Sequence, residues 1–243
     1  MKNPVKIFFT LLAIIPLTVF CQQPDAKKTI KIAIGITFSP DYCYRTLIPN
    51  ASSKPIADAR DTLEIPRFGY TTGLNLAIKI NKRITLETGI LYSDKGEKTK
   101  TYTVNEIVPQ GQINPFVPRK ITFYYHYIYL DIPFKLNYYL LNNRTRIFLT
   151  AGISPNIFLT CKTKSTTEYK DGHTTTHTST SSSDYRIFNL SIIAGAGLSY
   201  DLTSKLYFNI EPTYRRSITS IVDAPIKAYL YSIGLNTGLY YKL

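Results

Sequence analysis

The sequence predicts an all-β protein: a closed, eight-stranded antiparallel transmembrane β-barrel with up-and-down connections. Its strand-like segments alternate apolar and polar residues with a period of two. Most are longer than the about five or six residues of an ordinary strand and reach the about 9–11 needed to cross a bilayer at a tilt. Short turns and longer loops also alternate strictly along the chain, as they do in membrane barrels.

The first 21 residues have the features of a secretory signal peptide. Lys2 and Lys6 form a positive start, and an apolar stretch follows over residues 7–20. This stretch is shorter than the about 20 residues of a spanning helix and fits the apolar region of a signal. We therefore expect an exported chain.

Cleavage after Cys21 would leave residues 22–243 as a single barrel domain. The alternative is a lipoprotein in which Cys21 is acylated. Phe20 disfavours it, because the position before a lipidated cysteine normally holds a small residue.

The composition supports a membrane barrel. The chain has 20 Tyr and 12 Phe, residues that suit strands and the interfacial belts of a membrane protein. The formal charge of +13 falls to +11 once the two lysines of the signal are removed. A basic exterior favours contact with anionic lipopolysaccharide, and export argues against nucleic acid as a partner. No cofactor is implied.

Eight segments carry the strand pattern. They cover residues 28–39, 68–80, 84–92, 121–140, 145–160, 185–200, 205–216 and 227–243. Short turns are expected at 81–83, 141–144 and 201–204, and longer loops at 40–66, 93–120, 161–184 and 217–226. An even strand number puts both termini on one side, which we expect to be the periplasm. Pro155 predicts a bulge in the fifth strand.

The last strand shows the pattern most clearly. Every second residue from Tyr229 to Leu243 is apolar, aromatic or threonine, and the residues between are mostly small or polar. A final strand that stays apolar to its last residue resembles the C-terminal targeting strand of bacterial outer-membrane barrels.

Several segments resemble one family. They are the signal ending before Gln22-Gln23, the strand segment 68–75, the segment 127–136 (YIYLDIPFKL) and the run 195–200 (GAGLSY). Together they make the chain similar to the outer-membrane β-barrel proteins of Bacteroidetes-type bacteria, the PorT-like group. The resemblance implies a cell outer-membrane location and a link to type IX protein secretion.

The inward face of the expected barrel carries six charged residues. They are Lys79, Glu87, Asp131, Lys135, Glu211 and Arg215. They could line a polar conduit, but an eight-stranded barrel is filled by its own side chains, which favours internal ion pairs. We expect Glu87 to lie between Lys79 and Lys135 and to pair with at least one of them. Arg215 is expected to neutralise Asp131 and Glu211.

The chain offers little other candidate chemistry. His173 and His177 fall in a Ser/Thr-rich loop and are expected to be solvated rather than metal-binding. His126 lies on the apolar face, where an interfacial role is favoured over catalysis because Ile128 replaces a polar partner. No catalytic or metal-binding residue is predicted.

Two cysteines, Cys43 and Cys161, remain after removal of the signal. They are too few for a disulfide scaffold, and they fall at the outer ends of the first and fifth strands. Opposite walls are too far apart for a disulfide, which needs Cα atoms within about 7 Å. We expect both thiols to be free.

Three function classes remain open. A membrane scaffold that binds protein partners through its outer loops or periplasmic turns is favoured. A small-solute channel is disfavoured by the narrow interior. A lipid-modifying enzyme is disfavoured by the lack of partners for His126.

Overall fold

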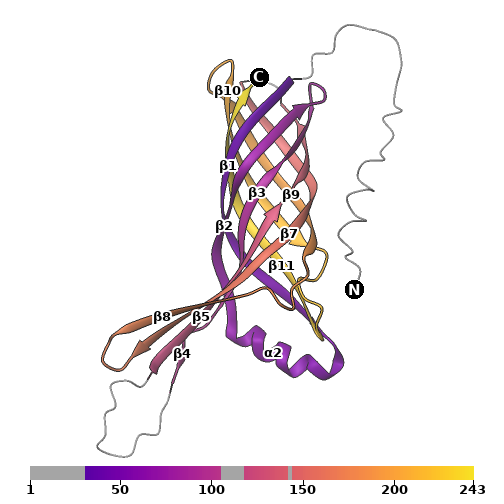
Figure 1. The fold of residues 1–243 in the computed structure, drawn as a ribbon. Coiled ribbons are helices and arrows are strands. Elements are labelled where there is room, and N and C mark those ends of the chain that lie inside the picture. The colour runs from indigo at the N-terminus through magenta and orange to yellow at the C-terminus, as the bar shows by residue number, and fades with distance from the viewer. Residues whose placement is uncertain (1–30, 105–117, 142–143) are drawn as a thin grey trace, which may run out of the picture.

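The computed structural model describes residues 31–104, 118–141 and 144–243, and within them eight antiparallel walls form a ring (Figure 1). The wall strands are β1 (Lys31–Pro49), β2 (Glu64–Lys79), β3 (Ile84–Thr99), β5 (Pro118–Asp131), β6 (Phe134–Tyr139), β7 (Thr145–Tyr169), β9 (Phe188–Asp201), β10 (Leu206–Ser217) and β11 (Ile226–Lys242). β5 and β6 share one wall, and β1 joins the ring by pairing with both β2 and β11. The predicted fold class is confirmed.

The period-two pattern separates the two faces of each wall. On β11, Ser232 and Tyr240 are buried inside, whereas Ile233 and Leu235 are exposed on the outside. Large apolar side chains are exposed on the outer face of the ring, and polar ones are buried within it. This is the reverse of a water-soluble barrel and matches a wall that faces lipid.

The wall formed by β5 and β6 is interrupted at Ile132 and Pro133. Pro133 has no N–H to give to the ladder, while the N–H of Ile132 still donates to the carbonyl of Pro155 at 2.9 Å. The bulge expected at Pro155 is wrong in position, because β7 keeps its register with β9 there. The shift in register falls later on β7, between Phe158 and Thr160, where it pairs with β5.

The segment expected to be a loop at 40–66 is mostly regular structure. β1 continues to Pro49, followed by the 3-10 helix η1 (Ala51–Ser53) and the α-helix α2 (Lys54–Leu63). Asn50 begins this helical stretch by accepting the backbone N–H of Ser53 at 2.9 Å. The polar residues of late β1 resemble those of a loop, but alternate ones point into the barrel and are buried.

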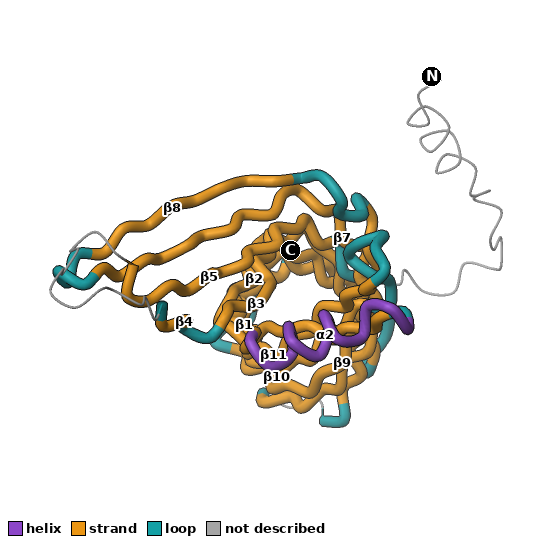
Figure 2. The backbone as a smooth tube through the Cα atoms, turned by 90° about the horizontal axis from the view of Figure 1, so that it is seen from below, coloured by secondary structure: helices purple, strands orange, loops and turns teal. Residues whose placement is uncertain are grey.

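The prediction of a Ser/Thr-rich loop at 161–184 is also wrong, because most of this segment is β-strand. β7 runs on to Tyr169 and returns as β8 (Thr174–Ser181), while β4 (Tyr102–Thr103) pairs with the start of β5. The result is a sheet in the order β4-β5-β7-β8 that extends away from the barrel (Figures 1 and 2). We call it the projecting sheet. Threonine favours strands, which explains how so polar a segment forms one.

The two ends of the barrel differ. The turn at 81–83 and the turn at 201–204 lie with the chain's C-terminus at one end, which we call the turn end. Asn81 closes the first turn by accepting two backbone N–H groups through its side-chain oxygen, each at 2.8 Å. Helix α2 and the projecting sheet lie at the other end, where α2 runs over the rim of the barrel (Figure 2).

Some expectations fall outside the described residues. These are the signal peptide and Cys21, the middle of the loop at 105–117, and the turn residues 142–143. Among the residues that are described, no helix is long and apolar enough to cross a membrane.

Candidate functional site

One of the most deeply buried charged groups in the barrel is Glu87 on β3, which is 2% exposed. The Nζ of Lys135 lies 2.7 Å from its carboxylate. Asn75 and Asn137 donate to it at 2.9 Å each, and the Tyr240 hydroxyl donates at 3.0 Å. Glu87 and Lys135 face each other directly across neighbouring strands, so the pair follows from the register.

Lys135 also reaches across the barrel to β10. Its Nζ lies 3.3 Å from Glu211, which accepts a further bond from Asn236 at 3.2 Å. One ammonium thus lies between two buried carboxylates, and each acid has additional amide donors. This is the arrangement that a charge needs when water is excluded.

A second cluster lies further from the turn end. Asp131 accepts from Lys95 at 2.7 Å, from Ser93 at 2.7 Å and from Asn156 at 2.5 Å. Lys95 lies in the range that was expected to be a loop. Arg215, the expected partner of Asp131, pairs with a different acid.

Arg215 pairs with Asp41 at 2.7 Å, so its expected role as neutraliser of Asp131 and Glu211 is wrong. Asp41 is fully buried and also accepts from the hydroxyls of Ser39 and Thr71 at 2.7 and 2.5 Å. It was missed because it belongs to the polar half of β1. The signal that could have identified Asp41 is the polar residue at every second position, which continues past Pro40.

Lys79 is the one candidate that stays outside these clusters. Within the described residues it forms no ion pair, and its neighbours across β1 and β3 are Lys31 and Thr85. Glu87 therefore pairs with one of the two cations, Lys135, which agrees with the expectation of at least one such pair. Lys79 lines a cavity at the turn end instead.

Helix α2 is tied to the barrel by charges. Arg45 on β1 donates to Glu64 at 2.8 Å and pairs with Asp61 of the helix. Arg60 of the helix holds the same Glu64 at 2.7 Å. Below them Glu97 is 1% exposed and accepts from a tyrosine hydroxyl at 2.9 Å. The helix thus covers a buried ionic layer.

His126 has an acidic partner that the sequence analysis did not find. Its Nδ1 lies 2.9 Å from Asp94, which stands on the neighbouring strand and also pairs with Arg67. Asp94 precedes His126 by 32 positions, so the residues beside His126 on its own strand do not indicate this contact. Arg67 already neutralises this carboxylate, which makes His126, Asp94 and Arg67 an ionic network toward the end of the barrel opposite the turn end.

The remaining histidines and the cysteines show no site. His173 lies 3.1 Å from Asp171 and stacks on Tyr169 at the tip of the projecting sheet. The described residues contain no cluster of side chains that could hold a metal. Cys43 and Cys161 are both buried free thiols.

Close packing fills the space between the walls. A Cβ added at Gly234 would overlap the carboxylate of Asp41, and one added at Gly35 would overlap the ring of Tyr240. Glycine is therefore required where an inward side chain lies over its cross-strand partner on the neighbouring strand.

A polar, ion-paired interior inside an apolar outer surface defines a membrane-spanning β-barrel. Residues 20–223 match the outer membrane protein β-barrel domain. The chain belongs to this family, and it is an integral β-barrel protein of the outer membrane, where it contacts lipid and lipopolysaccharide.

Solved outer-membrane proteins show a distant likeness. Neisserial surface protein A is 12% identical, with a TM-score of 0.46 over 87% of this chain and 97% of that one. OprG of Pseudomonas aeruginosa is 12% identical, with a TM-score of 0.44 over 88% and 95%. The attachment invasion locus protein Ail of Yersinia pestis is 12% identical, with a TM-score of 0.36 over 88% and 99%. No curated protein matches the sequence.

Proposed function

We propose that this protein is an outer-membrane scaffold that binds a protein partner through the projecting sheet. The observation that carries the proposal is the sheet itself, whose strand β8 is exposed at every residue. In the described part of the chain β8 pairs only with β7, so its other edge offers free backbone groups. Such an edge accepts an added strand from a partner.

In this proposal the turn end faces the periplasm, and α2 and the projecting sheet face outward. Short periplasmic turns and longer external connections are the rule in bacterial barrels. The resemblance to the PorT-like group makes the type IX secretion machinery the first partner to test.

The filled interior supports a scaffold over a small-solute channel. The buried side chains of the described residues include seven carboxylates and five cations, most of them in direct ion pairs. Paired side chains occupy the lumen, and their charges cancel, so little space and little electrostatic attraction remain for a passing solute. Liposomes that contain the protein should swell in small sugars no faster than empty liposomes, and faster swelling would favour the channel.

The His126–Asp94 pair is the one observation that favours a lipid-modifying enzyme. Arg67 holds the same carboxylate, which leaves Asp94 less able to support His126 as a base. Lipid A from cells that express the wild type and His126→Ala should give identical mass spectra. A modified lipid A that disappears in the variant would establish the enzyme.

The scaffold proposal is tested by crosslinking in whole cells followed by affinity capture. A variant in which residues 164–178 are replaced by a tight turn removes the tip of the projecting sheet and leaves the barrel walls intact. Its matched control is Thr176→Ser, which keeps the strand. Partners captured by the wild type and the control should be absent from the shortened variant. An unchanged set of partners would contradict the proposal.

A further inference from the structure

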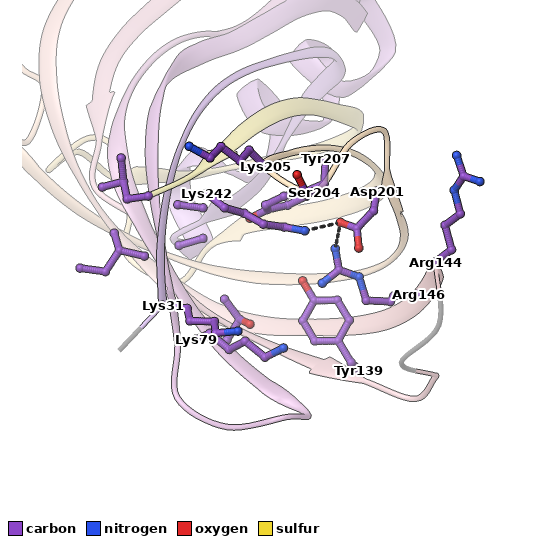
Figure 3. Close-up of a pocket in the computed structure, with 15 residues that line it drawn as sticks. Lys31, Lys79, Tyr139, Arg144, Arg146, Asp201, Ser204, Lys205, Tyr207 and Lys242 are labelled. Atoms are coloured by element: carbon purple, nitrogen blue, oxygen red, sulfur yellow. Dashed lines mark hydrogen bonds and ion pairs between the residues drawn. The ribbon is translucent and has the colours of Figure 1, made fainter. Parts of the chain in front are cut away.

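The turn end contains a cavity of about 780 Å³ that the ion-paired interior does not fill (Figure 3). We call it the basic vestibule. Its lining includes one acid, Asp201, and six cations: Lys31, Lys79, Arg144, Arg146, Lys205 and Lys242. This excess of positive charge contrasts with the rest of the interior, where cations and carboxylates are paired.

Asp201 neutralises only part of this charge. It accepts from Arg146 at 2.8 Å and from Lys242 at 2.7 Å. Both side chains converge on it in Figure 3. Among the described residues, no carboxylate pairs with the four other cations of the vestibule.

Two of those cations stand directly opposite each other. Lys31 on β1 and Lys79 on β2 are paired in the register of the sheet. Like charges at opposed positions destabilise a sheet, so this pair costs stability in the absence of a counter-ion. Figure 3 shows both side chains on the cavity wall, facing the Arg146 side. An anion between them would relieve the repulsion.

Arg146 supplies a fixed cation on the far wall. Its guanidinium lies 5.4 Å from the rings of both Tyr139 and Tyr207, and it also donates to Ser199 at 3.0 Å. Its side chain is 12% exposed. Its buried Nε has no acceptor among the described residues. The group is thus held rigidly with one donor unused.

We propose that the basic vestibule binds a phosphate-bearing anion. Lysine and arginine together are the usual phosphate ligands in proteins. Several unpaired cations also suit a bound anion with more than one negative charge, such as a phosphate, better than a ligand with a single carboxylate. The cavity volume falls within the range of about 300–1,000 Å³ for small-molecule sites. The tyrosine rings give the carrier of the phosphate an apolar surface. The phosphate belongs either to a soluble ester or to a phospholipid headgroup.

The test uses the mature protein folded in a zwitterionic detergent, with calorimetric titration of inorganic pyrophosphate and of glycerol 3-phosphate. Vesicles of phosphatidylglycerol and of phosphatidylcholine form the lipid arm. The site variant is Lys31→Gln with Lys79→Gln. The matched control is Lys162→Gln with Lys164→Gln, which removes the same charge from exposed positions of the projecting sheet.

We expect the wild type and the control to bind at least one probe, and the site variant to bind it about tenfold more weakly, because two partly exposed cations each contribute modestly. Binding of the soluble probes identifies a soluble ester. Binding of phosphatidylglycerol vesicles alone identifies a headgroup.

The absence of binding in both arms would overturn the proposal, as would equal weakening in the site variant and the control. If the site variant does not fold, Lys205→Gln with Arg144→Gln removes two other cations of the vestibule. These lie at its rim, where Arg144 turns away from the cavity in Figure 3, so a smaller weakening is expected. No weakening at all in that pair would also count against the site.

Discussion

Replacement of Lys135 by methionine should strongly destabilise the barrel. The ammonium lies 2.7 Å from Glu87 and 3.3 Å from Glu211, and both acids are 2% exposed. Methionine keeps most of the volume but leaves two buried carboxylates without their cation. Breaking a buried pair from one side costs roughly 3–5 kcal/mol.

The chain contains no Trp, so folding is best followed by far-ultraviolet circular dichroism and by the shifted gel mobility of folded barrels. For a slope of about 2–3 kcal/mol per molar urea, the loss lowers the midpoint by roughly 1–2 M. The matched control is Glu168→Gln on the projecting sheet, whose partners are exposed lysine and arginine side chains. It should shift the midpoint by little, because exposed pairs contribute about 0–1 kcal/mol.

Neutralising the acids as well should recover part of the loss. In the triple variant Lys135→Met, Glu87→Gln, Glu211→Gln no uncompensated charge remains, so we expect a midpoint between those of the single variant and the wild type. If Lys135→Met shifts the midpoint no more than Glu168→Gln does, the lumen charges are solvated. The polar-conduit interpretation would then regain weight.

Three further predictions follow from other parts of the molecule. Gly234→Ala should lower the urea midpoint, because its methyl group would overlap the buried carboxylate of Asp41; a wild-type midpoint would show that the wall can shift. Protease added to whole cells should cut within residues 161–184, and cutting at the short turns instead would invert the proposed orientation. The His173 backbone N–H and ring lower the pKa of the Asp171 carboxyl, so their contact persists as the pH falls through the ordinary value of about 3.9 and is lost only below it. In a carbon-detected NMR titration, the pKa of the Asp171 carboxyl should lie nearer its ordinary value in His173→Ala than in the wild type.

The membrane-facing half of the fold was predictable because its signal is local. Lipid selects an apolar residue at every second position, and that period can be read from one strand alone, as on β11. The half of the barrel away from the turn end was not predictable in the same way. Once β3 leaves the apolar band, its outward residues become polar as well, and Asp94 and Glu97 resemble loop residues although they are buried.

The ion pairs show the same limit more sharply. Glu87 and Lys135 could be matched because they lie opposite each other on neighbouring strands joined by a predicted register. The partner of Arg215 could not, because Asp41 lies 174 positions away in a segment that the sequence marked as a loop. The sequence was enough to predict that each charge is buried. It was not enough to predict the partner of each charge, because that depends on contacts between distant parts of the ring.

The distribution of pairing along the barrel indicates where function lies. In the middle, each buried cation has a carboxylate within hydrogen-bond distance, as Lys95 and Lys135 have, so these charges are committed to the fold. At the end opposite the turn end, Arg60 of α2 and Arg45 of β1 pair with Glu64 in the same way. Among the described residues, an unpaired strand edge lies at one extreme, on β8, and two opposed cations without an ion pair, Lys31 and Lys79, lie at the other. Charges that are paired in the middle of the barrel and unpaired groups at its two ends support the two proposals made above, in which the barrel holds a protein partner at one end and an anion at the other rather than passing a solute.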